Sequence, residues 1–467
     1  MLAGTMSIEG KAPELAGRVL WYLDDAGRRW VGGWGSEGDA RLRPAGDEEL
    51  RVLAACDGAR GSPALAREAG VTIGEAERIL DDWSASIPGS FAWRPSGGPD
   101  KRARQDAIAL DMLLEARAVD RLASIPDNRA YHASRIADAE RHFDDVENTV
   151  SHAYGGAHPA LRGRSYGEAF FDACASLRAL RPGARVLEIG CGTGRFARAF
   201  LDAMAAHLPD AYRTATYTMF DLAPALTASQ RRLTSPHADR TAFENGDIET
   251  HSFGSRRFDL VIANEMMADL SVEIADRDRP GAVACVERYA LSGEGALRRF
   301  VVNSGAIRLL ERIAGILEPG GCAVATEYGS RDAFPVAVEL GDHTEHSIHF
   351  GHLEQVARRL GLDPRCESLL SWLGFDASCE VIANDSLMLL RRLSRQIFGR
   401  PLPAAAYTRE QLRDAVGGAL DRVENVRFRR VGDRRSHMCP GEFQALRMRR
   451  GAAATRASSA RAPASVG

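Results

Sequence analysis

The stretch Arg185-Val-Leu-Glu-Ile-Gly-Cys-Gly-Thr-Gly-Arg195 decides the fold that this chain predicts. Its first half, Val186 to Ile189, is a short apolar run that follows a Pro-Gly pair, which is typical of a buried strand. Three glycines come next, and the apolar periodicity of a helix then runs from Phe196 to His207. The stretch therefore predicts a strand, a glycine turn and a helix in direct succession.

The glycine turn also predicts a ligand site, because glycine lets the main chain approach a ligand closely and a helix start offers unpaired N–H groups. The spacing, Glu-x-Gly-x-Gly-x-Gly, differs from the Gly-x-Gly-x-x-Gly that binds a pyrophosphate. An acid here would repel a pyrophosphate but suits the ammonium group of S-adenosylmethionine. The run resembles motif I of class I methyltransferases. That resemblance implies a Rossmann-like α/β fold with a seven-stranded sheet and S-adenosyl-L-methionine as cofactor, bound by Glu188, Gly190, Cys191, Gly192 and Gly194.

Two further acids follow predicted strands and extend the cofactor site. The strand Tyr217 to Asp221 ends 33 residues after Glu188, which leaves room for one crossover helix between parallel strands. Asp221, followed by Leu222, is placed to accept the ribose hydroxyls, as in dinucleotide folds. The next strand ends at Asn245-Gly-Asp-Ile248, and there the resemblance assigns Asp247 and Ile248 to adenine; a simple turn role for Asp247 stays open.

The methyl acceptor is expected at the carboxyl ends of the fourth and fifth strands, since ligands of open α/β sheets bind there. The fourth strand, Phe258 to Ala263, runs into Asn264 and Glu265, and the fifth is followed by Glu327. These three are predicted catalytic residues, and Asn264 is also expected to contact the cofactor. Two carboxylates suit an amine acceptor better than a hydroxyl, which would more often need a histidine base; no histidine follows the fourth strand.

Class I methyltransferases commonly close the cofactor site with an N-terminal segment that bears a tyrosine. The resemblance therefore makes Tyr166 a lid candidate, and packing between helices is the alternative for this side chain. Residues 97–180 around it are expected to form a helical connector and lid, with helices at 105–121 and 133–152.

Four stretches carry a narrower resemblance: Ser165-Tyr-Gly-Glu168, the run from Phe220 to Gln230, Asn264-Glu265, and Glu327-Tyr-Gly329. Together they resemble the MidA family, which includes a mitochondrial arginine methyltransferase that acts in complex I assembly. The resemblance covers about residues 165 to 385 and implies an arginine or another amine as acceptor. The acid that follows the family's Asn-Glu pair stands one position later here, at Asp269.

Residues 12–96 predict a separate module like a small winged helix. Strands at 17–23 and 29–34 precede helices at 47–56, 62–69 and 72–83. The last helix carries four acids against one arginine, which argues against DNA. Two uses stay open, homodimerisation and peptide recognition. The second rests on Arg41-Leu-Arg43, Leu50, Leu53, Cys56-Asp-Gly-Ala-Arg60 and Ala64-Leu-Ala66, which resemble the PqqD-like elements that bind leader peptides in RiPP biosynthesis as an added strand.

The methyltransferase domain is expected to span residues 181–450, followed by a disordered tail at 451–467 rich in Ala, Arg and Ser. Within it, 271–300 is expected to be a partly mobile flap beside the acceptor pocket. The alternating stretches Asn425–Arg430 and Phe443–Met448 predict an antiparallel hairpin at one edge of the sheet.

The composition excludes several other classes of protein. A net charge of −3 over 467 residues argues against a nucleic-acid partner. Eight scattered cysteines without a C-x-x-C pair predict reduced thiols in a cytoplasmic protein and no zinc site. The start lacks the apolar core of a signal peptide, and no apolar run is long enough to span a membrane. His343, His346 and His349 would not share one face of a strand, so we expect a packing or polar role and no metal.

Overall fold

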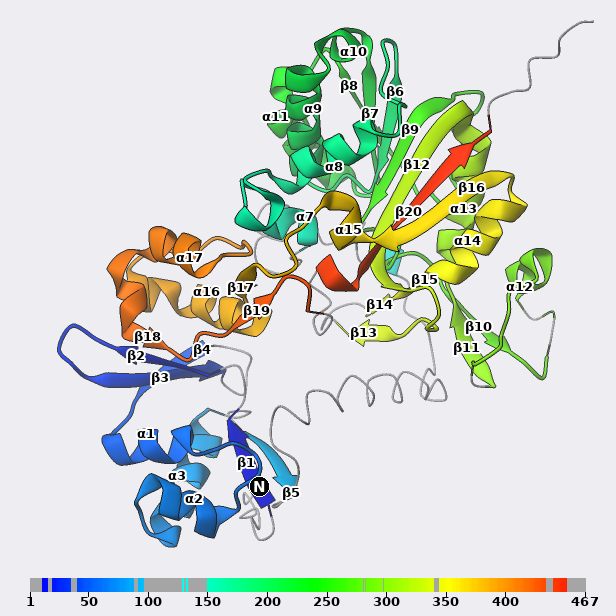
Figure 1. The fold of residues 1–467 in the computed structure, drawn as a ribbon. Coiled ribbons are helices and arrows are strands. Elements are labelled where there is room, and N and C mark those ends of the chain that lie inside the picture. Colours follow the sequence, from blue (N-terminus) through cyan, green and yellow to red (C-terminus); the bar gives the residue numbers. More distant parts are fainter. Residues whose placement is uncertain are drawn as a thin grey trace, which may run out of the picture. The chain divides into compact units, whose positions relative to one another are not determined.

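The computed structural model describes residues 11–15, 19–34, 40–87, 91–95, 128–129, 132, 149–279, 281, 283–296, 298–339, 344–433 and 440–451. The chain divides into two compact units, each built from separate stretches (Figure 1). Unit 1 comprises Met1–Arg121, Glu140–Tyr166 and Gly374–Glu442, and unit 2 comprises Leu122–Ala139, Gly167–Leu373 and Phe443–Gly467.

Unit 2 is organised around one large sheet. Its main strands follow the order β16-β20-β12-β9-β6-β7-β8, and β15 (Ile348–His349) pairs with the end of β12. Strands β8 (Thr241–Asn245), β7 (Thr216–Asp221), β6 (Arg185–Ile189), β9 (Phe258–Asn264) and β12 (Leu317–Ser330) are parallel to one another. Strand β20 (Phe443–Arg450) runs antiparallel between β12 and β16 (Leu362–Ser368). The predicted Rossmann-like α/β fold is confirmed.

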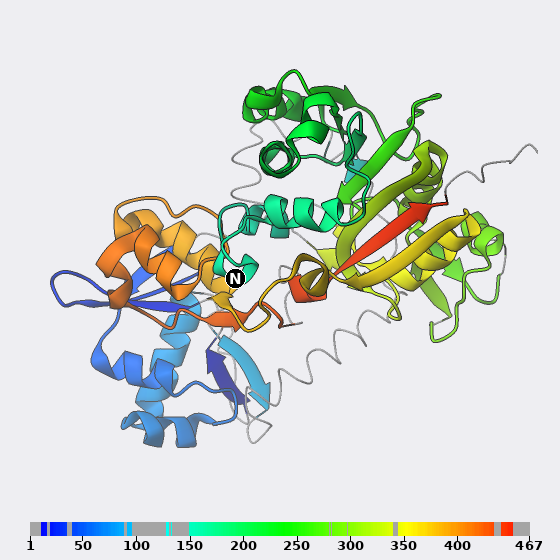
Figure 2. The same ribbon diagram turned by 45° about the horizontal axis from the view of Figure 1, so that its top comes forward.

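Helices cover both faces of this sheet (Figures 1 and 2). Successive residues of a strand face opposite sides, so one face carries Leu187, Val261 and Ala323, which share a core with α13 (Ser304–Ile316) and α14 (Phe350–Arg359). On the other face Tyr217 packs against Phe200 of α9, with ring centroids 5.8 Å apart. The helices of this half are α8 (Tyr166–Ala175), α9 (Arg195–His207), α10 (Pro209–Thr214) and α11 (Thr227–Leu233). Burial on both faces explains the nearly unbroken apolar runs of β6 and β9.

Shorter elements complete unit 2. They are β10 (Glu273–Asp276), α12 (Ala284–Tyr289), β11 (Arg299–Val302), β13 (Ala337–Glu339), β14 (Thr344–His346) and α15 (Leu369–Leu373). Strands β10 and β11 pair with each other, as do β13 and β14.

The predicted hairpin at the sheet edge is wrong in one of its strands. Phe443–Arg450 does form the antiparallel strand, but its outer partner is β16. The other predicted stretch, Asn425–Arg430, contains β19 (Phe428–Arg430), which pairs with β17 (Glu380–Ile382) in unit 1. Alternation of apolar and polar residues identifies a strand but carries no information about its partner.

Unit 1 joins the N-terminal module to a late stretch of chain. Its sheet has the order β18-β2-β3-β4, made of β2 (Leu20–Leu23), β3 (Arg29–Trp34), β4 (Ala40–Pro44) and β18 (Val423–Glu424). The helices are α1 (Asp47–Ala54), α2 (Ser62–Ala69), α3 (Ile73–Ser86), α7 (Val150–Ala153), α16 (Asn384–Phe398) and α17 (Arg409–Val416). Strands β1 (Lys11–Leu15) and β5 (Phe91–Pro95) form a separate pair. The three predicted helices of the module are confirmed.

Helix α16 packs directly on the N-terminal strands. A Cβ built on Gly32 of β3 would lie 2.6 Å from Leu393 Cδ1, so a larger residue at this position would require the Leu393 side chain to move. Leu20, Leu390 and Leu412 belong to the same buried cluster. The structure thus groups residues 374–442 with the N-terminal strands, whereas the sequence placed them in the methyltransferase domain.

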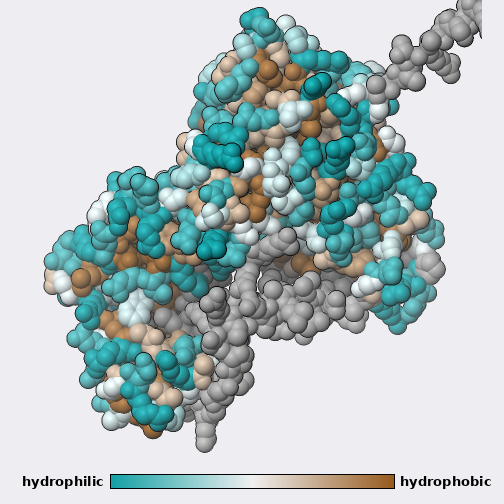
Figure 3. Space-filling view, in the orientation of Figure 1, coloured by the Kyte–Doolittle hydropathy of each residue, from teal (hydrophilic) through white to brown (hydrophobic). Residues whose placement is uncertain are grey.

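Some predictions fall outside the described residues. They are the helix at 105–121, most of the helix at 133–152, and the tail beyond Gly451. In the part of the chain that the structure describes, no helix has both the length and the apolar character to cross a membrane. On the face shown in Figure 3, hydrophilic residues cover most of the surface, and the exposed large apolar side chains of the described residues are Leu23 and Ile73.

Candidate cofactor and acceptor site

The glycine turn has the geometry that its sequence predicts. Between β6 and α9, Gly190, Gly192 and Gly194 have φ values of 72°, 51° and 91°, which side chains disfavour. A Cβ on Gly190 would lie 2.8 Å from the Cβ of Met266, in the loop after β9. The turn therefore brings bare main chain to the carboxyl edge of the sheet, where a ligand can approach it.

Asp221 ends β7 and fixes this turn. Its Oδ2 accepts a hydrogen bond from the N–H of Gly192 and its Oδ1 one from the N–H of Ala223, both at 2.9 Å. The sulfur of Cys191 lies 3.8 Å from Oδ2. Burial raises the pKa of Asp221 to about 6, although the N–H groups of Ala223 and Gly192 oppose this effect. Leu222 beside it is half-buried.

Gln230 on α11 supports the same turn, since its Nε2 donates to the carbonyl of Gly192 at 2.9 Å. The side chain is buried and its Cα lies 3.1 Å from where a Cβ of Gly194 would be. Gln230 belongs to the Phe220–Gln230 run of the MidA resemblance, which predicts no role for its side chain. A polar residue in an otherwise ordinary helix gives no local sign of its partner.

Glu188 lies inside the sheet, 2% exposed, and accepts a hydrogen bond from the hydroxyl of Tyr217 at 2.9 Å. Burial raises its pKa to about 8, against the effect of the Tyr217 hydroxyl, and the charge of Asp221 adds to the rise. This carboxyl is thus an interior group on β6, beside the turn.

The raised pKa of Glu188 predicts that the stability of the folded protein depends on pH. In the folded protein the Glu188 carboxyl stays neutral up to its raised pKa of about 8, whereas in the unfolded chain it ionises above the ordinary pKa of 4.5. Ionisation therefore favours the unfolded chain, and the contribution of Glu188 to the free energy of unfolding falls as the pH rises from 4.5 to 8. Glu188→Gln keeps an acceptor for Tyr217 and cannot ionise. We expect its melting temperature to exceed that of the wild type by several degrees at pH 8 and to converge with it at pH 5. Parallel melting curves across that range would contradict the assignment.

Asp247 follows β8 at the same edge. Its Oδ1 accepts from the N–H of Glu249 at 2.9 Å, which is the turn role that the sequence left open. Its Oδ2 lies 3.5 Å from Nη1 of Arg129, a helical residue from the N-terminal side of the domain. Ile248 is buried in the core of unit 2. The acid therefore lies at the expected edge with one oxygen facing a cation.

The expected acceptor end is built on β9 and β12. Asn264 is buried, accepts from the Thr326 hydroxyl at 2.8 Å and donates to Oε1 of Glu265 at 3.1 Å. Glu265 has φ 51°, which is uncommon for a residue with a side chain, and its N–H donates to the carbonyl of Thr326 at 3.0 Å. Strained backbone of this kind is often found at functional sites.

Glu327 is buried and faces the loop after β9. Its Oε2 accepts from the N–H groups of Met267 and Ala268, at 2.9 and 3.2 Å, and its Oε1 from the N–H of Tyr328 at 3.0 Å. Burial raises the pKa of Glu327, and the charges of Glu345 and Glu265 add to the rise. The geometry thus makes Glu327 an anchor of the acceptor loop.

A histidine that the sequence analysis did not consider reaches this loop. Nε2 of His132 lies 2.9 Å from Oδ1 of Asp269, and both side chains are partly buried. His132 also interacts electrostatically with Asp221. Asn128, four residues earlier in the sequence, is buried and donates to the carbonyl of Thr344 at 2.7 Å. Residues far apart in sequence meet here, so no local pattern could have indicated the contact.

Tyr166, the lid candidate, begins α8 and is fully buried. Its N–H donates to the carbonyl of Tyr154 at 2.8 Å. Tyr154 in turn packs edge-on against Phe375 and His158. The lid role of Tyr166 stays a prediction.

Of the predicted histidine series, His346 lies beside the loop after β9, since its N–H donates to the carbonyl of Ala268 at 3.1 Å. His343 is outside the described residues. His349 instead stacks on His352, with ring centroids 3.8 Å apart, and burial lowers the pKa of both rings. Among the described residues no three His, Cys, Asp or Glu side chains gather as a metal site would require.

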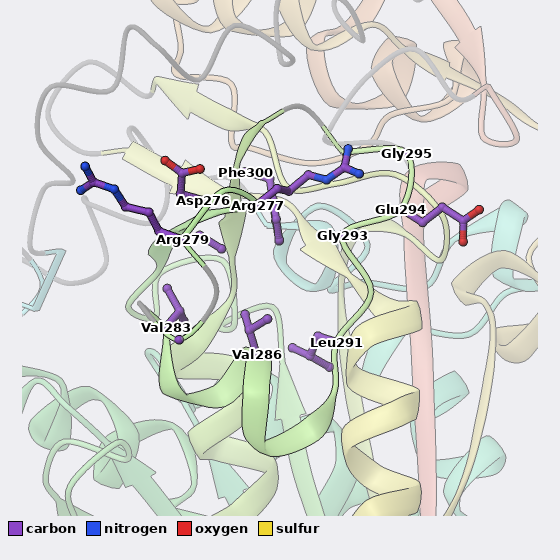
Figure 4. A pocket seen from close by; sticks show the side chains of 12 residues that line it. Asp276, Arg277, Arg279, Val283, Val286, Leu291, Gly293, Glu294, Gly295 and Phe300 are labelled. Carbon is purple, nitrogen blue, oxygen red and sulfur yellow. The ribbon is translucent and has the colours of Figure 1, made fainter.

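The expected flap, residues 271–300, folds into β10, α12 and β11. These elements surround a hollow of about 340 Å³ whose floor includes Val283, Val286 and Leu291 (Figure 4). Tyr289 and Arg288 bond to Glu311 of α13, which fixes α12 to the body of unit 2. None of the predicted site residues lines the hollow.

Comparison with known proteins agrees with this geometry. A family model described as a methyltransferase domain matches residues 186–289. No curated protein matches the chain. Similar solved structures include a protein from Burkholderia thailandensis bound to S-adenosylhomocysteine (16% identity, TM-score 0.41, 77% of this chain and 96% of that one). Another is the [4+2]-cyclase SpnF, with 15% identity and a TM-score of 0.39 over 70% of this chain and 98% of that one. A third is the CcbJ methyltransferase from Streptomyces caelestis, with 13% identity and a TM-score of 0.32 over 66% of this chain and 97% of that one.

These TM-scores are too low to carry an argument, so the assignment rests on the family match and on the site. The matched residues begin in β6, contain the glycine turn and end in α12. The fold and the site therefore define a class I methyltransferase. The protein is an S-adenosylmethionine-dependent methyltransferase, and the open turn, the buried Asp221 and the start of α9 fit that cofactor.

Proposed function

We propose that the protein methylates a nitrogen of a peptide or protein, in the manner of the MidA family that its sequence resembles. The bound cofactor supplies an electrophilic methyl group on a sulfonium. In this proposal Gly190, Gly192 and Gly194 line its path together with Cys191. Asp221 and Leu222 bind the ribose, Asp247 and Ile248 the adenine, and Glu188 supports the methionine end.

Glu265 and Asn264 are the proposed acceptor-binding pair. Methyl transfer is an in-line displacement, so the protein mainly has to align the acceptor and disperse the charge that develops on it. The observation that carries this proposal is the fixed geometry of Glu265, whose main chain is bound to Thr326 and whose carboxylate is held by Asn264. Glu327 contributes by holding the loop that follows.

The peptide part of the proposal rests on the module at 12–96. Strand β4 is the last strand of its sheet within the described residues, and it contains the Arg41-Leu-Arg43 run of the PqqD-like resemblance. Arg43 bonds to Asp82 at 2.6 Å and lies over the Trp83 ring of α3 at 4.3 Å. A strand edge beside a helix is the arrangement that β-augmentation uses, so we propose that a leader peptide adds to β4.

The second candidate is O- or N-methylation of a small molecule, with residues 12–96 used for dimerisation. One observation favours it. His132 lies beside Asp269 at the acceptor end, and a hydroxyl acceptor needs a base of this kind.

A transfer assay separates the two candidates. The protein is incubated with S-[methyl-³H]adenosylmethionine and either arginine- and lysine-containing peptides or small phenols and amines. We expect label in peptides, and a variant with Leu42→Pro in β4 should lose most of it because proline disrupts strand pairing. Label confined to small molecules would refute the peptide proposal, as would full peptide transfer by the Leu42→Pro variant.

A further inference from the structure

We propose that His132 is the general base that takes a proton from the methyl acceptor, and that Asp269 orients it. The proposal rests on the methyltransferase activity and not on the identity of the acceptor. It begins from the contact of 2.9 Å between Nε2 of His132 and Oδ1 of Asp269. The two side chains are 16% and 26% exposed, so the contact is largely shielded from water.

The contacts of two helical residues, Arg129 and His132, set the position of this pair relative to the cofactor site. Arg129 faces Asp247 after β8, while His132 faces Asp269 after β9. These two side chains thus contact the proposed adenine acid and the proposed acceptor end, and His132 interacts electrostatically with Asp221 between them.

Nearby contacts hold the surroundings of this pair. Asn128, four residues before His132, is buried and donates to the carbonyl of Thr344. Glu327 accepts from the N–H groups of Met267 and Ala268, directly before Asp269. The loop that carries Asp269 is therefore anchored immediately before this residue.

The chemistry of the imidazole assigns the roles. The Asp269 carboxylate, 2.9 Å from Nε2, favours a proton on that nitrogen, and a neutral ring protonated there carries its lone pair on Nδ1. The lone pair of the acceptor atom forms the new bond to the methyl carbon, and the carbon–sulfur bond breaks with its electron pair going to sulfur. The acceptor proton passes to Nδ1, and the resulting imidazolium is stabilised by the Asp269 carboxylate. Glu327 is less suited to this step because its carboxylate already accepts three main-chain hydrogen bonds.

The first test needs no acceptor. The rate at which diethylpyrocarbonate modifies His132 is measured by peptide mass spectrometry, with the exposed His207 of α9 as internal control. We expect saturating S-adenosylhomocysteine to slow the reaction at His132 at least fivefold and Asp269→Asn to slow it severalfold, with no change at His207. Equal rates at His132 with and without S-adenosylhomocysteine, or in Asp269→Asn, would overturn the proposal.

The second test measures turnover with whichever acceptor the transfer assay identifies. His132→Gln keeps a donor for Asp269 but has no basic nitrogen. We expect kcat to fall by about 10²- to 10⁴-fold while the affinity for S-adenosylhomocysteine stays within threefold, and added imidazole should restore part of the rate of His132→Gly. The proposal would be overturned if His132→Gln kept the wild-type kcat, or if its affinity for S-adenosylhomocysteine fell by as much as its kcat. It would also be overturned if imidazole restored none of the activity of His132→Gly. If only small molecules accept label, the peptide proposal fails while this one stands.

Discussion

Replacing Glu265 with alanine should lower kcat by about 10²- to 10³-fold and leave the affinity for S-adenosylhomocysteine within about twofold of the wild type. The carboxylate lies at the proposed acceptor end, where Asn264 donates to its Oε1 at 3.1 Å. Its removal therefore takes away charge stabilisation that matters for transfer while the cofactor residues stay in place. Methyl transfer from labelled cofactor and calorimetry with S-adenosylhomocysteine measure the two quantities separately.

Two matched variants separate the side chain from the backbone. Glu265→Gly accepts φ 51° without strain and should be at least as stable as Glu265→Ala, yet equally inactive. Glu265→Gln keeps the contact with Asn264 but not the charge, so an intermediate kcat is expected. A Glu265→Gly variant with wild-type turnover, or a Glu265→Ala variant that no longer binds S-adenosylhomocysteine, would remove Glu265 from the acceptor site.

Replacing Asp221 with alanine should raise the dissociation constant of S-adenosylhomocysteine by about 100-fold, which corresponds to about 2.7 kcal/mol. The variant loses the carboxylate that is proposed to accept hydrogen bonds from the ribose hydroxyls. It also loses the acceptor of the Gly192 and Ala223 N–H groups, which fixes the glycine turn. In the wild type the affinity should also fall as the pH drops below about 6, where Asp221 gains a proton. Calorimetry at pH 5, 6 and 7.5 measures both effects.

The control for Asp221 is Asp363→Ala on β16, an exposed acid of the same sheet, which should leave the affinity unchanged. Circular dichroism melting confirms that each variant is folded before its affinity is compared. An Asp221→Ala variant that is folded and binds S-adenosylhomocysteine as tightly as the wild type would contradict the ribose assignment.

Local features of the site were predictable from the sequence. The strand, turn and helix around Gly190 are consecutive, so their hydrogen bonds and glycine φ angles depend mainly on nearby residues. The same holds for the capping box of α3, where Thr72 accepts from the N–H of Glu75 at 3.2 Å. The carboxyl ends of parallel strands meet at one edge, which is why Asp221, Asp247 and Asn264 were found in this way.

The role of Glu327 shows where such reasoning stops. The sequence placed it directly after the fifth strand, whereas β12 continues through Glu327 to Ser330; the sequence also suggested a carboxylate near the acceptor. Its three main-chain partners come from the loop after β9 and from Tyr328, and their direction depends on how two loops fold against each other. A strand end therefore locates an acid but does not show which way its side chain turns.

The sequence by itself determined the class of fold, the glycine turn and the acids at the strand ends, because these follow from short-range periodicity and from the rules of parallel sheets. Only the tertiary structure decided that residues 374–442 join the N-terminal strands, and that His132 meets Asp269. Periodicity records which side of an element is buried, but not what covers it. Contacts between residues that are distant in sequence depend on how the folded elements pack and on the charges that packing brings together.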